Sequence, residues 1–522
     1  MEKNKIASSI KYLVLSIKSW IKQNPWDALI LFLILVVGAF FRLYKIDQYM
    51  TFLGDEGRDA IIVRRLLVLR DPILIGPGTS IGNMYLGPLY YYMMAPALFL
   101  AGYSPVGPAV QIAILGVITI FMVWYFAHKW FGKWAAVIAA ALYAISPTII
   151  IYSRSSWNPN IMPFFSLLCI YSIWKVWQEN KFNWLIVLGI SYAFVLQSHY
   201  LGLLLAPTIF LFWLLTYFKI RNSKFEIRNY TKKSLLSLGI FLCLMSPLVI
   251  FDIRHGGRNF SAIYKFFSER QTTVSIRPWT AIPKAWPIIT KINTRLVSGQ
   301  NVLAGKIITG LVVGAFIFML YLNKKSKKPL LHIPYYLLLA WLGFAIIGLG
   351  LYKQEIYDHY YGFFFAAPFL LFGGLAQFYI QKYKKAGFIV SIVVLLLIIL
   401  NLKENPLRRS PNRLLERSQK IAAKIEEESG GKPFNLAVLA ERNYEDGYQY
   451  FLEKDNYPVI DIDAQKLDKT ITNQLFVVCE MAKEKCDPTH SPKAEVANFG
   501  CSKIESEWEI MGITIYKLVH KK

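Results

Sequence analysis

The residues best suited to chemistry are two adjacent carboxylates, Asp55 and Glu56, which lie between two glycines and are followed by Arg58. A carboxylate beside a cation can accept a proton from an attacking hydroxyl while the cation neutralises a phosphate leaving group. The same pair offers hard oxygen ligands for Mg²⁺ or Mn²⁺. A solvated loop would explain an isolated acidic pair equally simply, so the elements that position the pair decide its interpretation.

The surrounding sequence is that of a membrane protein. Of its 522 residues, 55% are hydrophobic and 17% are charged, and the mean hydropathy is +0.37. Soluble domains carry about 25% charged residues. A net charge of +25 fits basic cytoplasmic loops and contact with anionic membrane lipids. No basic stretch carries a nucleic-acid recognition motif, so nucleic acid is not an expected partner.

Twelve apolar runs are candidates for membrane spans. They are Ala28–Tyr44, Leu86–Gly102, Pro105–Ala127, Trp134–Ile151, Ile161–Trp177, Trp184–Gln197, Leu201–Phe218, Leu235–Ile253, Leu303–Leu322, Pro334–Tyr352, Gly362–Ile380 and Phe388–Leu402. The acidic pair follows the first run and leads into RDAIIVRRLLVLRD, a segment with helical spacing of its apolar residues.

The basic loops between these runs test how many of them cross the membrane, because short loops rich in Lys and Arg face the cytoplasm. These loops are Lys129–Lys133, Lys175–Lys181, Lys219–Lys233, Lys324–Lys328 and Lys382–Lys385. All of them face inward only if Leu86–Gly102, which carries Gly, Pro and three consecutive tyrosines, lies in the interface instead of crossing. The sequence therefore predicts a polytopic α-helical membrane protein with about eleven spans and a first outer loop over residues 45–104.

The N-terminal segment, residues 1–26, is expected in the cytoplasm, and residues 27–402 are expected to form the transmembrane domain. Lysines alternate with apolar residues over residues 1–22, which predicts a basic amphipathic helix on the inner membrane surface. The small residues Val37-Gly38-Ala39, which follow an apolar run, leave a cleaved signal peptide as the alternative.

Residues 403–522 change in character and predict an extracytoplasmic α/β domain. The expected helices are Asn412–Ser429 and Glu445–Glu453, and the expected strands are Phe434–Leu439, Tyr457–Ile462, Gln474–Val478 and Ile513–Leu518. Cys479, Cys486 and Cys501 lie in this domain. An oxidising compartment allows one disulfide among these three cysteines and leaves one of them free.

The stretch GDEGRDA, followed by DPILIGPGTSIGNMYLGPLYYY, resembles the first outer loop of the GT-C glycosyltransferases. It is most similar to the protein O-mannosyltransferases and the aminoarabinose transferase of lipid A, which use polyprenyl-phosphate-linked sugars and have juxtamembrane helices in that loop. The resemblance implies that Asp55 is the catalytic base and that Glu56 supports it or orients the acceptor. It also favours a reaction without a metal or another cofactor.

One position departs from the family pattern. Aminoarabinose transferases often have a lysine before the proline of the juxtamembrane segment, where it meets the donor phosphate, whereas this chain has Gly87. The cation for the phosphate must then come from elsewhere on the outer side. The candidates are Arg58, Arg154, Arg254 and Arg258, of which Arg254 is favoured. Contact with lipid headgroups is the alternative role for each of these arginines.

Further outer-side residues are candidates to line the substrate site. They are Tyr90, Tyr91, Trp157, Asn158, His199, Tyr200, Asp358, His359 and Tyr360. A tryptophan can stack on a sugar and an asparagine can hydrogen-bond to it, and polar groups at a helix break favour a wet cavity. The simpler interpretations are an aromatic belt at the membrane interface, an Asn-Pro turn and a structural histidine.

The expected function is inverting transfer of a sugar from a polyprenyl-phosphate carrier to a hydroxyl or amine acceptor outside the plasma (inner) membrane. The acceptor is a protein, a lipid or a cell-envelope glycan. A flippase for a lipid-linked glycan is the main alternative, and it would favour charged or broken helices at mid-bilayer and a repeated half. A membrane scaffold is a further alternative, although it leaves the outer polar clusters unexplained.

Overall fold

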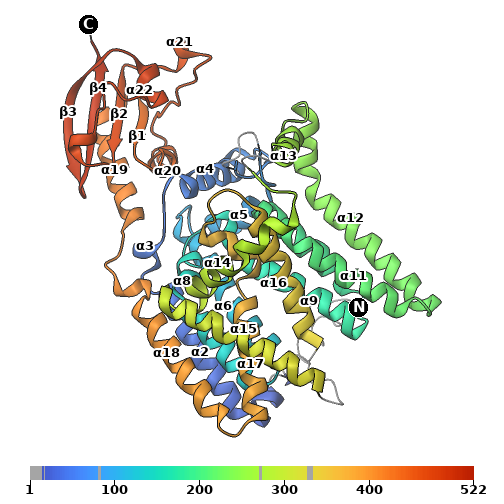
Figure 1. Ribbon diagram of the computed structural model, residues 1–522. Coiled ribbons are helices and arrows are strands. Elements are labelled where there is room, and N and C mark those ends of the chain that lie inside the picture. The colour runs from blue at the N-terminus through green and yellow to red at the C-terminus, as the bar shows by residue number, and fades with distance from the viewer. Residues whose placement is uncertain (1–14, 17, 80–83, 270–272, 326–332, 522) are drawn as a thin grey trace.

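The computed structural model describes residues 15–16, 18–79, 84–269, 273–325 and 333–521. A bundle of helices forms most of the molecule, and a small α/β domain lies at one end of it (Figure 1). The amphipathic helix expected over residues 1–22 falls largely outside the described residues.

Within the described chain, eight helical stretches are long and apolar enough to cross a membrane. They are Pro25–Leu43 (α2), Val106–Trp130 (α6), Asn158–Glu179 (a 3-10 turn and α9, Met162–Glu179), Tyr200–Ile220 (a 3-10 turn and α11, Ala206–Ile220), Lys224–Arg254 (α12), Val302–Lys325 (α15), Ile333–Leu351 (α16) and Ala386–Lys403 (α18). A ninth is formed if the 3-10 turn Asp358–Phe364 and α17 (Ala367–Lys382), which meet at a bend of 57°, count as one span.

Two of the eleven expected spans form shorter helices than the sequence predicts. The run Trp134–Ile151 is divided at Pro147 into α7 (Lys133–Ile145) and α8 (Pro147–Tyr152), and α10 (Trp184–Ser198) has 15 residues. A helix of 13 to 15 residues is about 20 to 23 Å long, less than the roughly 30 Å of a hydrocarbon core. The count of eleven is therefore not confirmed, although the helical membrane fold is.

The segment expected to form the first outer loop, residues 45–104, contains three helices in place of a span. They are α3 (Ile46–Tyr49), α4 (Gly54–Leu69) and α5 (Leu89–Leu100). With 12 residues, α5 is too short to cross, as the charge bias of the loops predicts. Helices α4 and α5 lie at the end of the bundle that carries the C-terminal domain (Figure 1).

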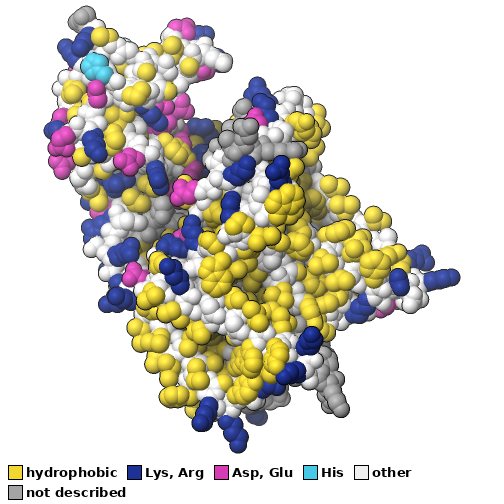
Figure 2. Space-filling model, viewed as in Figure 1, with side chains coloured by type: hydrophobic (Ala, Val, Ile, Leu, Met, Phe, Trp, Pro, Cys, Tyr) yellow, Lys and Arg dark blue, Asp and Glu magenta, His cyan; other side chains and the backbone are white. Residues whose placement is uncertain are grey.

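Contacts among the basic loops place them together at the other end of the bundle. Lys129 pairs with Glu179 at 2.6 Å, and Lys219 Nζ donates to the Trp177 carbonyl at 2.7 Å. Lys133 pairs with Asp27 at the start of α2. Apolar side chains cover the helical part between this basic rim and the C-terminal domain, whose visible surface mixes acidic and basic residues (Figure 2). The loop Lys324–Lys328 lies partly outside the described residues.

The remaining helices of the bundle lie between α12 and α15. They are α13 (Arg258–Ser268) and α14 (Ile282–Ile292). The C-terminal domain contains α19 (Leu414–Ser429), β1 (Asn435–Leu439), α20 (Asp446–Lys454), α21 (Leu467–Thr470), β2 (Gln474–Cys479), α22 (Ala494–Phe499), β3 (Ser502–Ile510) and β4 (Ile513–His520).

The sheet of this domain has the order β1-β2-β4-β3, with β1 parallel to β2 and the other pairs antiparallel. Strands β1 and β2 are buried along their whole length, which gives the domain its own core. Cys479 and Cys486 form a disulfide, and Cys501 is free, so one bond does form among the three cysteines. The expected strand Tyr457–Ile462 is reduced to a single bridge between Val459 and Phe434.

Candidate active site

The first turn of α4 is capped by the C-terminal domain. The Glu56 carboxylate accepts a hydrogen bond from the main-chain N–H of Leu53 at 3.0 Å, as in a capping box. The next free N–H, that of Gly54, donates to the Asn443 side-chain oxygen at 2.8 Å. Because the first N–H groups of a helix lack partners within it, the loop around Asn443 satisfies one of them. Two segments that are far apart in the sequence thus meet at the acidic pair.

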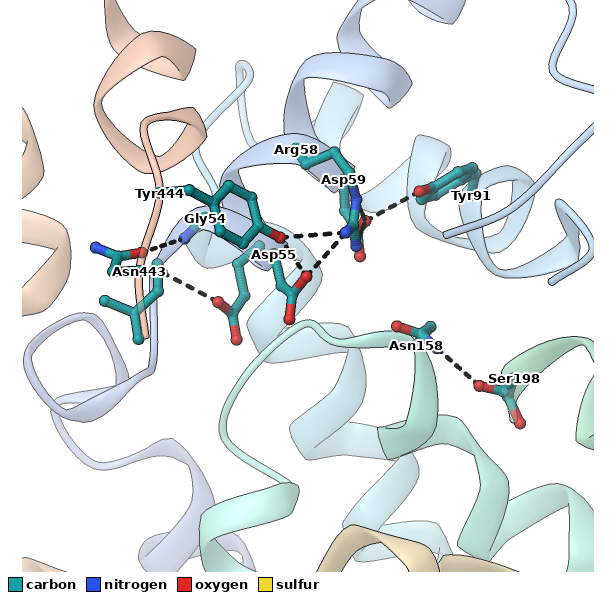
Figure 3. Close-up of polar contacts among 11 residues, drawn as sticks. Gly54, Asp55, Arg58, Asp59, Tyr91, Asn158, Ser198, Asn443 and Tyr444 are labelled. Carbon is teal, nitrogen blue, oxygen red and sulfur yellow. Dashed lines mark hydrogen bonds and ion pairs between the residues drawn. The ribbon is translucent and has the colours of Figure 1, made fainter. Parts of the chain in front are cut away.

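One carboxylate oxygen of Asp55 is hydrogen-bonded by its neighbours, and the other accepts no hydrogen bond from the described residues. Its Oδ1 accepts hydrogen bonds from Arg58 at 2.8 Å and from the hydroxyl of Tyr444 (Figure 3). No hydrogen bond to Oδ2 is formed by the part of the chain that the structure describes. The side chain is 41% exposed. A fixed carboxylate with one accessible oxygen is the arrangement that a general base requires.

Arg58 is held from behind by a second acid, Asp59. The Arg58 guanidinium lies 2.7 Å from Asp59, which is fully buried and accepts a hydrogen bond from the Tyr91 hydroxyl at 3.0 Å. Tyr90 is also buried, and its hydroxyl lies 2.6 Å from that of Ser156. The structure therefore buries both tyrosines away from the cavity wall, with Tyr91 bonded to α4 through Asp59 and Tyr90 bonded to the segment between α8 and α9.

A cavity of about 300 Å³ opens in front of the acidic pair, at the lower end of the range for small-molecule sites. Its wall combines the acidic loop, the segment between α8 and α9, and the C-terminal domain. The residues that line it are Thr51, Leu53, Gly54, Asp55, Glu56, Ile151, Tyr152, Ser155, Trp157, Asn160, Arg442, Asn443 and Tyr444. Trp157 therefore lies where the sequence places it, facing the same cavity as Asp55.

An aromatic cluster lies between this cavity and a second, apolar cavity of about 280 Å³. The ring of His359 lies 4.6 Å from that of Trp157 and 4.6 Å from that of Tyr360. Tyr360, His199 and Tyr200 line the second cavity together with Phe266, Phe267 and other apolar side chains. Four of the residues expected to line the substrate site thus lie here. His199, Tyr200 and Tyr360 line the apolar cavity, and His359 lies between that cavity and the acidic one.

Two other expected lining residues make structural contacts. The Asn158 amide donates to the Ser198 carbonyl at 2.7 Å and is buried (Figure 3). Asp358 accepts three hydrogen bonds from Arg295, two from Nε at 2.9 and 2.8 Å and one from Nη2. These bonds fasten the segment before α9 to the end of α10 and the segment before α17 to the turn before α15.

The predicted phosphate-binding arginines do not gather in the acidic cavity. Arg154 is 2% exposed and donates to the carbonyl oxygens of Phe41 and Tyr44 at the end of α2. Arg254 and Arg258 are exposed at the junction of α12 and α13 and do not line the cavity. Among the described residues, Arg442 is the one cation on the cavity wall, and it has no ion pair there.

Burial changes the protonation of the acids around Arg58. It raises the pKa of Glu56 from 4.5 to about 7 and that of Asp59 from 3.8 to about 6. Burial also raises the pKa of Asp446, at the start of α20, to about 7. In each case a carboxylate removed from water resists ionisation. The contact between α4 and α20 therefore holds several acids that are protonated in mild acid.

Replacing Glu56 by glutamine is expected to remove part of the pH dependence of stability. Because the pKa of Glu56 is about 7 in the folded chain and 4.5 as the unperturbed value, the wild-type protein loses stability as pH rises from 4.5 to 7. The neutral variant avoids this loss, which is at most about 3 kcal/mol. Melting temperatures at pH 5 and pH 8 measure the effect, with the exposed Glu441→Gln as control. Equal pH dependence in Glu56→Gln and wild type would contradict the assignment.

Sequence reasoning missed the residues that the C-terminal domain contributes, Arg442, Asn443 and Tyr444. They lie in the polar stretch ERNYED, which has no motif and reads as an ordinary loop. Asp59 was also missed, although its place four residues after Asp55 puts both on one face of a helix. That spacing is the signal that could have identified it.

Comparisons with known proteins agree with this architecture. Residues 86–251 match the family model described as dolichyl-phosphate-mannose-protein mannosyltransferase. ArnT from Cupriavidus metallidurans, solved with undecaprenyl phosphate, has 11% sequence identity and a TM-score of 0.60, over 95% of this chain and 98% of that one. Comparison with curated protein sequences gives no match.

A second similar structure is the archaeal oligosaccharyltransferase AglB from Archaeoglobus fulgidus, solved with an inhibitory peptide and a dolichol-phosphate. It has 12% identity and a TM-score of 0.52, over 88% of this chain and 70% of that one. At such identities the structural likeness shows a shared fold. The chain therefore has the fold of these membrane glycosyltransferases, and its residues 86–251 are similar to the mannosyltransferase family.

Proposed function

We propose that this protein transfers a sugar from a polyprenyl-phosphate carrier to a hydroxyl or amine acceptor at the outer face of the plasma membrane, with inversion at the anomeric carbon. The observation that carries the proposal is the pairing of two cavities. The packed rings of Trp157, His359 and Tyr360 lie between a cavity with Asp55 on its wall and an apolar cavity. Such a pair suits a donor with a sugar phosphate at one end and an isoprenoid chain at the other.

The proposed chemistry is a single displacement. Asp55 Oδ2 accepts the proton of the acceptor as its oxygen or nitrogen attacks the anomeric carbon, and the bond from that carbon to the phosphate oxygen breaks. The lipid phosphate leaves with the bonding electrons, and a cation stabilises its charge. Among the described residues, no group of three or more His, Cys, Asp or Glu side chains is arranged to hold a metal ion. We therefore propose a metal-independent reaction.

A disulfide at one end of the bundle and basic loops at the other end support the proposed location of the acidic cavity on the outer side of the membrane. The Cys479–Cys486 disulfide lies in the domain that contacts the acidic cavity, and disulfides persist in oxidising compartments. The basic loops joined by Lys129, Lys133 and Lys219 lie at the opposite end, as expected of a cytoplasmic face.

Reconstitution tests the proposal directly. The purified protein, placed in vesicles with a series of polyprenyl-phosphate-linked sugars, is expected to release polyprenyl phosphate when an acceptor mixture from the same membranes is present. A flippase would instead move the labelled lipid between leaflets and leave its sugar–phosphate bond intact. That result would overturn the proposal.

Arg442 is expected to stabilise the leaving phosphate, because it is the unpaired cation on the cavity wall. Arg442→Gln is expected to lower the rate of transfer about 10-fold to 100-fold, the scale of a lost charge-assisted hydrogen bond. Arg442→Lys is expected to recover part of that rate. Release of labelled polyprenyl phosphate measures both variants, with the exposed Arg409 changed to glutamine as control. Unaltered transfer by Arg442→Gln would contradict this role.

A further inference from the structure

We infer that Tyr444, on the C-terminal domain, is a positioning residue that orients the Asp55 carboxylate for proton transfer. This inference rests on the proposed function and assigns a role to the C-terminal domain. That domain contributes part of the wall of the reaction cavity through Arg442, Asn443 and Tyr444. The domain is thus a component of the active site and not an appendage.

The Tyr444 hydroxyl belongs to a closed set of three hydrogen bonds (Figure 3). It donates to Asp55 Oδ1, and it accepts from Arg58 Nη1 at 3.2 Å. Arg58 Nη1 also donates to Asp55 Oδ1 at 2.8 Å. Two donors on the same oxygen fix the rotation of the carboxyl group and direct Oδ2 away from both. Burial raises the pKa of Tyr444, so its hydroxyl stays protonated and remains a donor.

Glycines at the start of α4 allow the domain to come this close. A β-carbon added to Gly54 would lie 2.5 Å from a ring carbon of Tyr444, and one added to Gly57 would lie 2.3 Å from the Asp446 carbonyl oxygen. The β-carbons of real side chains essentially never approach other heavy atoms within 3.0 Å. The two glycines that flank the acidic pair thus make room for the Tyr444 ring and for the first turn of α20.

The loop that carries Tyr444 is itself held by hydrogen bonds to α4 and within the C-terminal domain. Asn443 fixes the main chain next to Tyr444 by accepting from Gly54, and it donates to Glu480 at 2.6 Å. Glu480 is held in turn by Tyr448 and Arg417 within the domain. A rigid network therefore supports the Tyr444 hydroxyl, whereas Oδ2 of Asp55 remains open to the cavity.

Tyr444→Phe, which keeps the ring and removes the hydroxyl, tests the inference in the full-length protein in vesicles. We expect kcat to fall about 10-fold to 100-fold, because a charge-assisted hydrogen bond to the base is lost. The KM for the lipid-linked donor should change less than about threefold, since the ring still packs on Gly54. The acidic limb of the rate profile should move to higher pH, because the ionised carboxylate loses a stabilising donor.

Two further variants distinguish the effect of the Tyr444 hydroxyl on Asp55 from the effect of a loosened C-terminal domain. Asn443→Ala loosens the same loop but keeps the hydroxyl, so it should leave the acidic limb in place even if transfer slows. Tyr457→Phe, elsewhere in the domain, should behave as wild type. Tryptic cleavage after Arg408 and Arg409 reports whether the domain stays docked in each variant.

Transfer by Tyr444→Phe within twofold of wild type, or an unshifted acidic limb, overturns the inference and leaves the proposed function intact. The same acidic shift in Asn443→Ala also overturns it, because docking alone would then explain the effect. Absence of transfer by the wild-type protein with every donor refutes the proposed function and the inference together.

Discussion

Asp55→Asn is expected to lower the rate of sugar transfer by about 100-fold to 10,000-fold, the usual contribution of a general base. The amide has the shape of the carboxylate, and its oxygen can still accept hydrogen bonds from Arg58 and Tyr444. It cannot take a proton from the acceptor. The substitution therefore removes the chemistry and keeps the contacts that hold α4. Transfer of radiolabelled sugar from a polyprenyl-phosphate donor in membranes is the measurement.

Asp71→Asn is the matched control, because Asp71 is an exposed acid that follows α4 on the same loop. It should transfer sugar at the wild-type rate. Equal amounts of both variants in the membrane and equal affinity for the donor exclude misfolding as the cause. Transfer by Asp55→Asn within about tenfold of wild type would show that another group is the base.

Gly57→Ala is expected to separate the C-terminal domain from α4. The added methyl would lie 2.3 Å from the Asp446 carbonyl oxygen and 2.4 Å from the Gly447 nitrogen, and both are main-chain atoms that cannot rotate away. Overpacking of this kind costs about 1 to 3 kcal/mol. Moving α20 also withdraws Arg442 and Tyr444 from the cavity, so transfer should fall at least about 10-fold.

Gly239→Ala is the matched control, since Gly239 is a helical glycine with open space around its α-carbon. Tryptic cleavage between the bundle and the domain, after Arg408 and Arg409, should accelerate in Gly57→Ala and stay unchanged in Gly239→Ala. Both residues are exposed, so cleavage there reports how tightly the domain is held. Normal transfer and normal cleavage in Gly57→Ala would mean that the domain is not required at the site.

The composition of the chain and the positions of its basic loops were enough to predict the membrane fold, because apolar residues are more stable in lipid and charged residues are more stable in water. They also gave α5 as a helix that does not cross. The span count failed at α7 and α10, since an apolar run does not show where a helix will end. Pro147 marks the break after α7, but a proline inside a membrane helix is often tolerated.

In the C-terminal domain, the sequence likewise did not show where every strand forms. The strand β3 (Ser502–Ile510) was missed because its sequence, SKIESEWEI, carries acidic residues, as an edge strand does. Its alternation of Ile504, Trp508 and Ile510 was the available signal. The run Tyr457–Ile462 has the composition of a strand but forms only one bridge, between Val459 and Phe434 beside the edge strand β1.

The sequence was enough to locate the acidic pair, because the glycines and the arginine beside it are adjacent in the chain. It did not show the partner of Asp55 on the C-terminal domain, because Asp55 and Tyr444 are separated by 389 residues and no sequence pattern links them. Arg154 shows the converse error. Its position in an outer loop favoured a ligand contact, but its side chain turns inward to two carbonyl groups at the end of α2. Only the packed chain shows which arginine faces the cavity.

The distance in sequence between Gly54 and Asn443 has a consequence for the life of the chain. The ribosome makes α4 long before it makes its cap, because 389 residues separate the two. At common rates of synthesis this interval is about 20 to 80 s. On the proposed mechanism, a chain that has not yet reached Tyr444 holds Asp55 without the groups that orient it, so sugar transfer is expected to begin only after the C-terminal domain is made and docked.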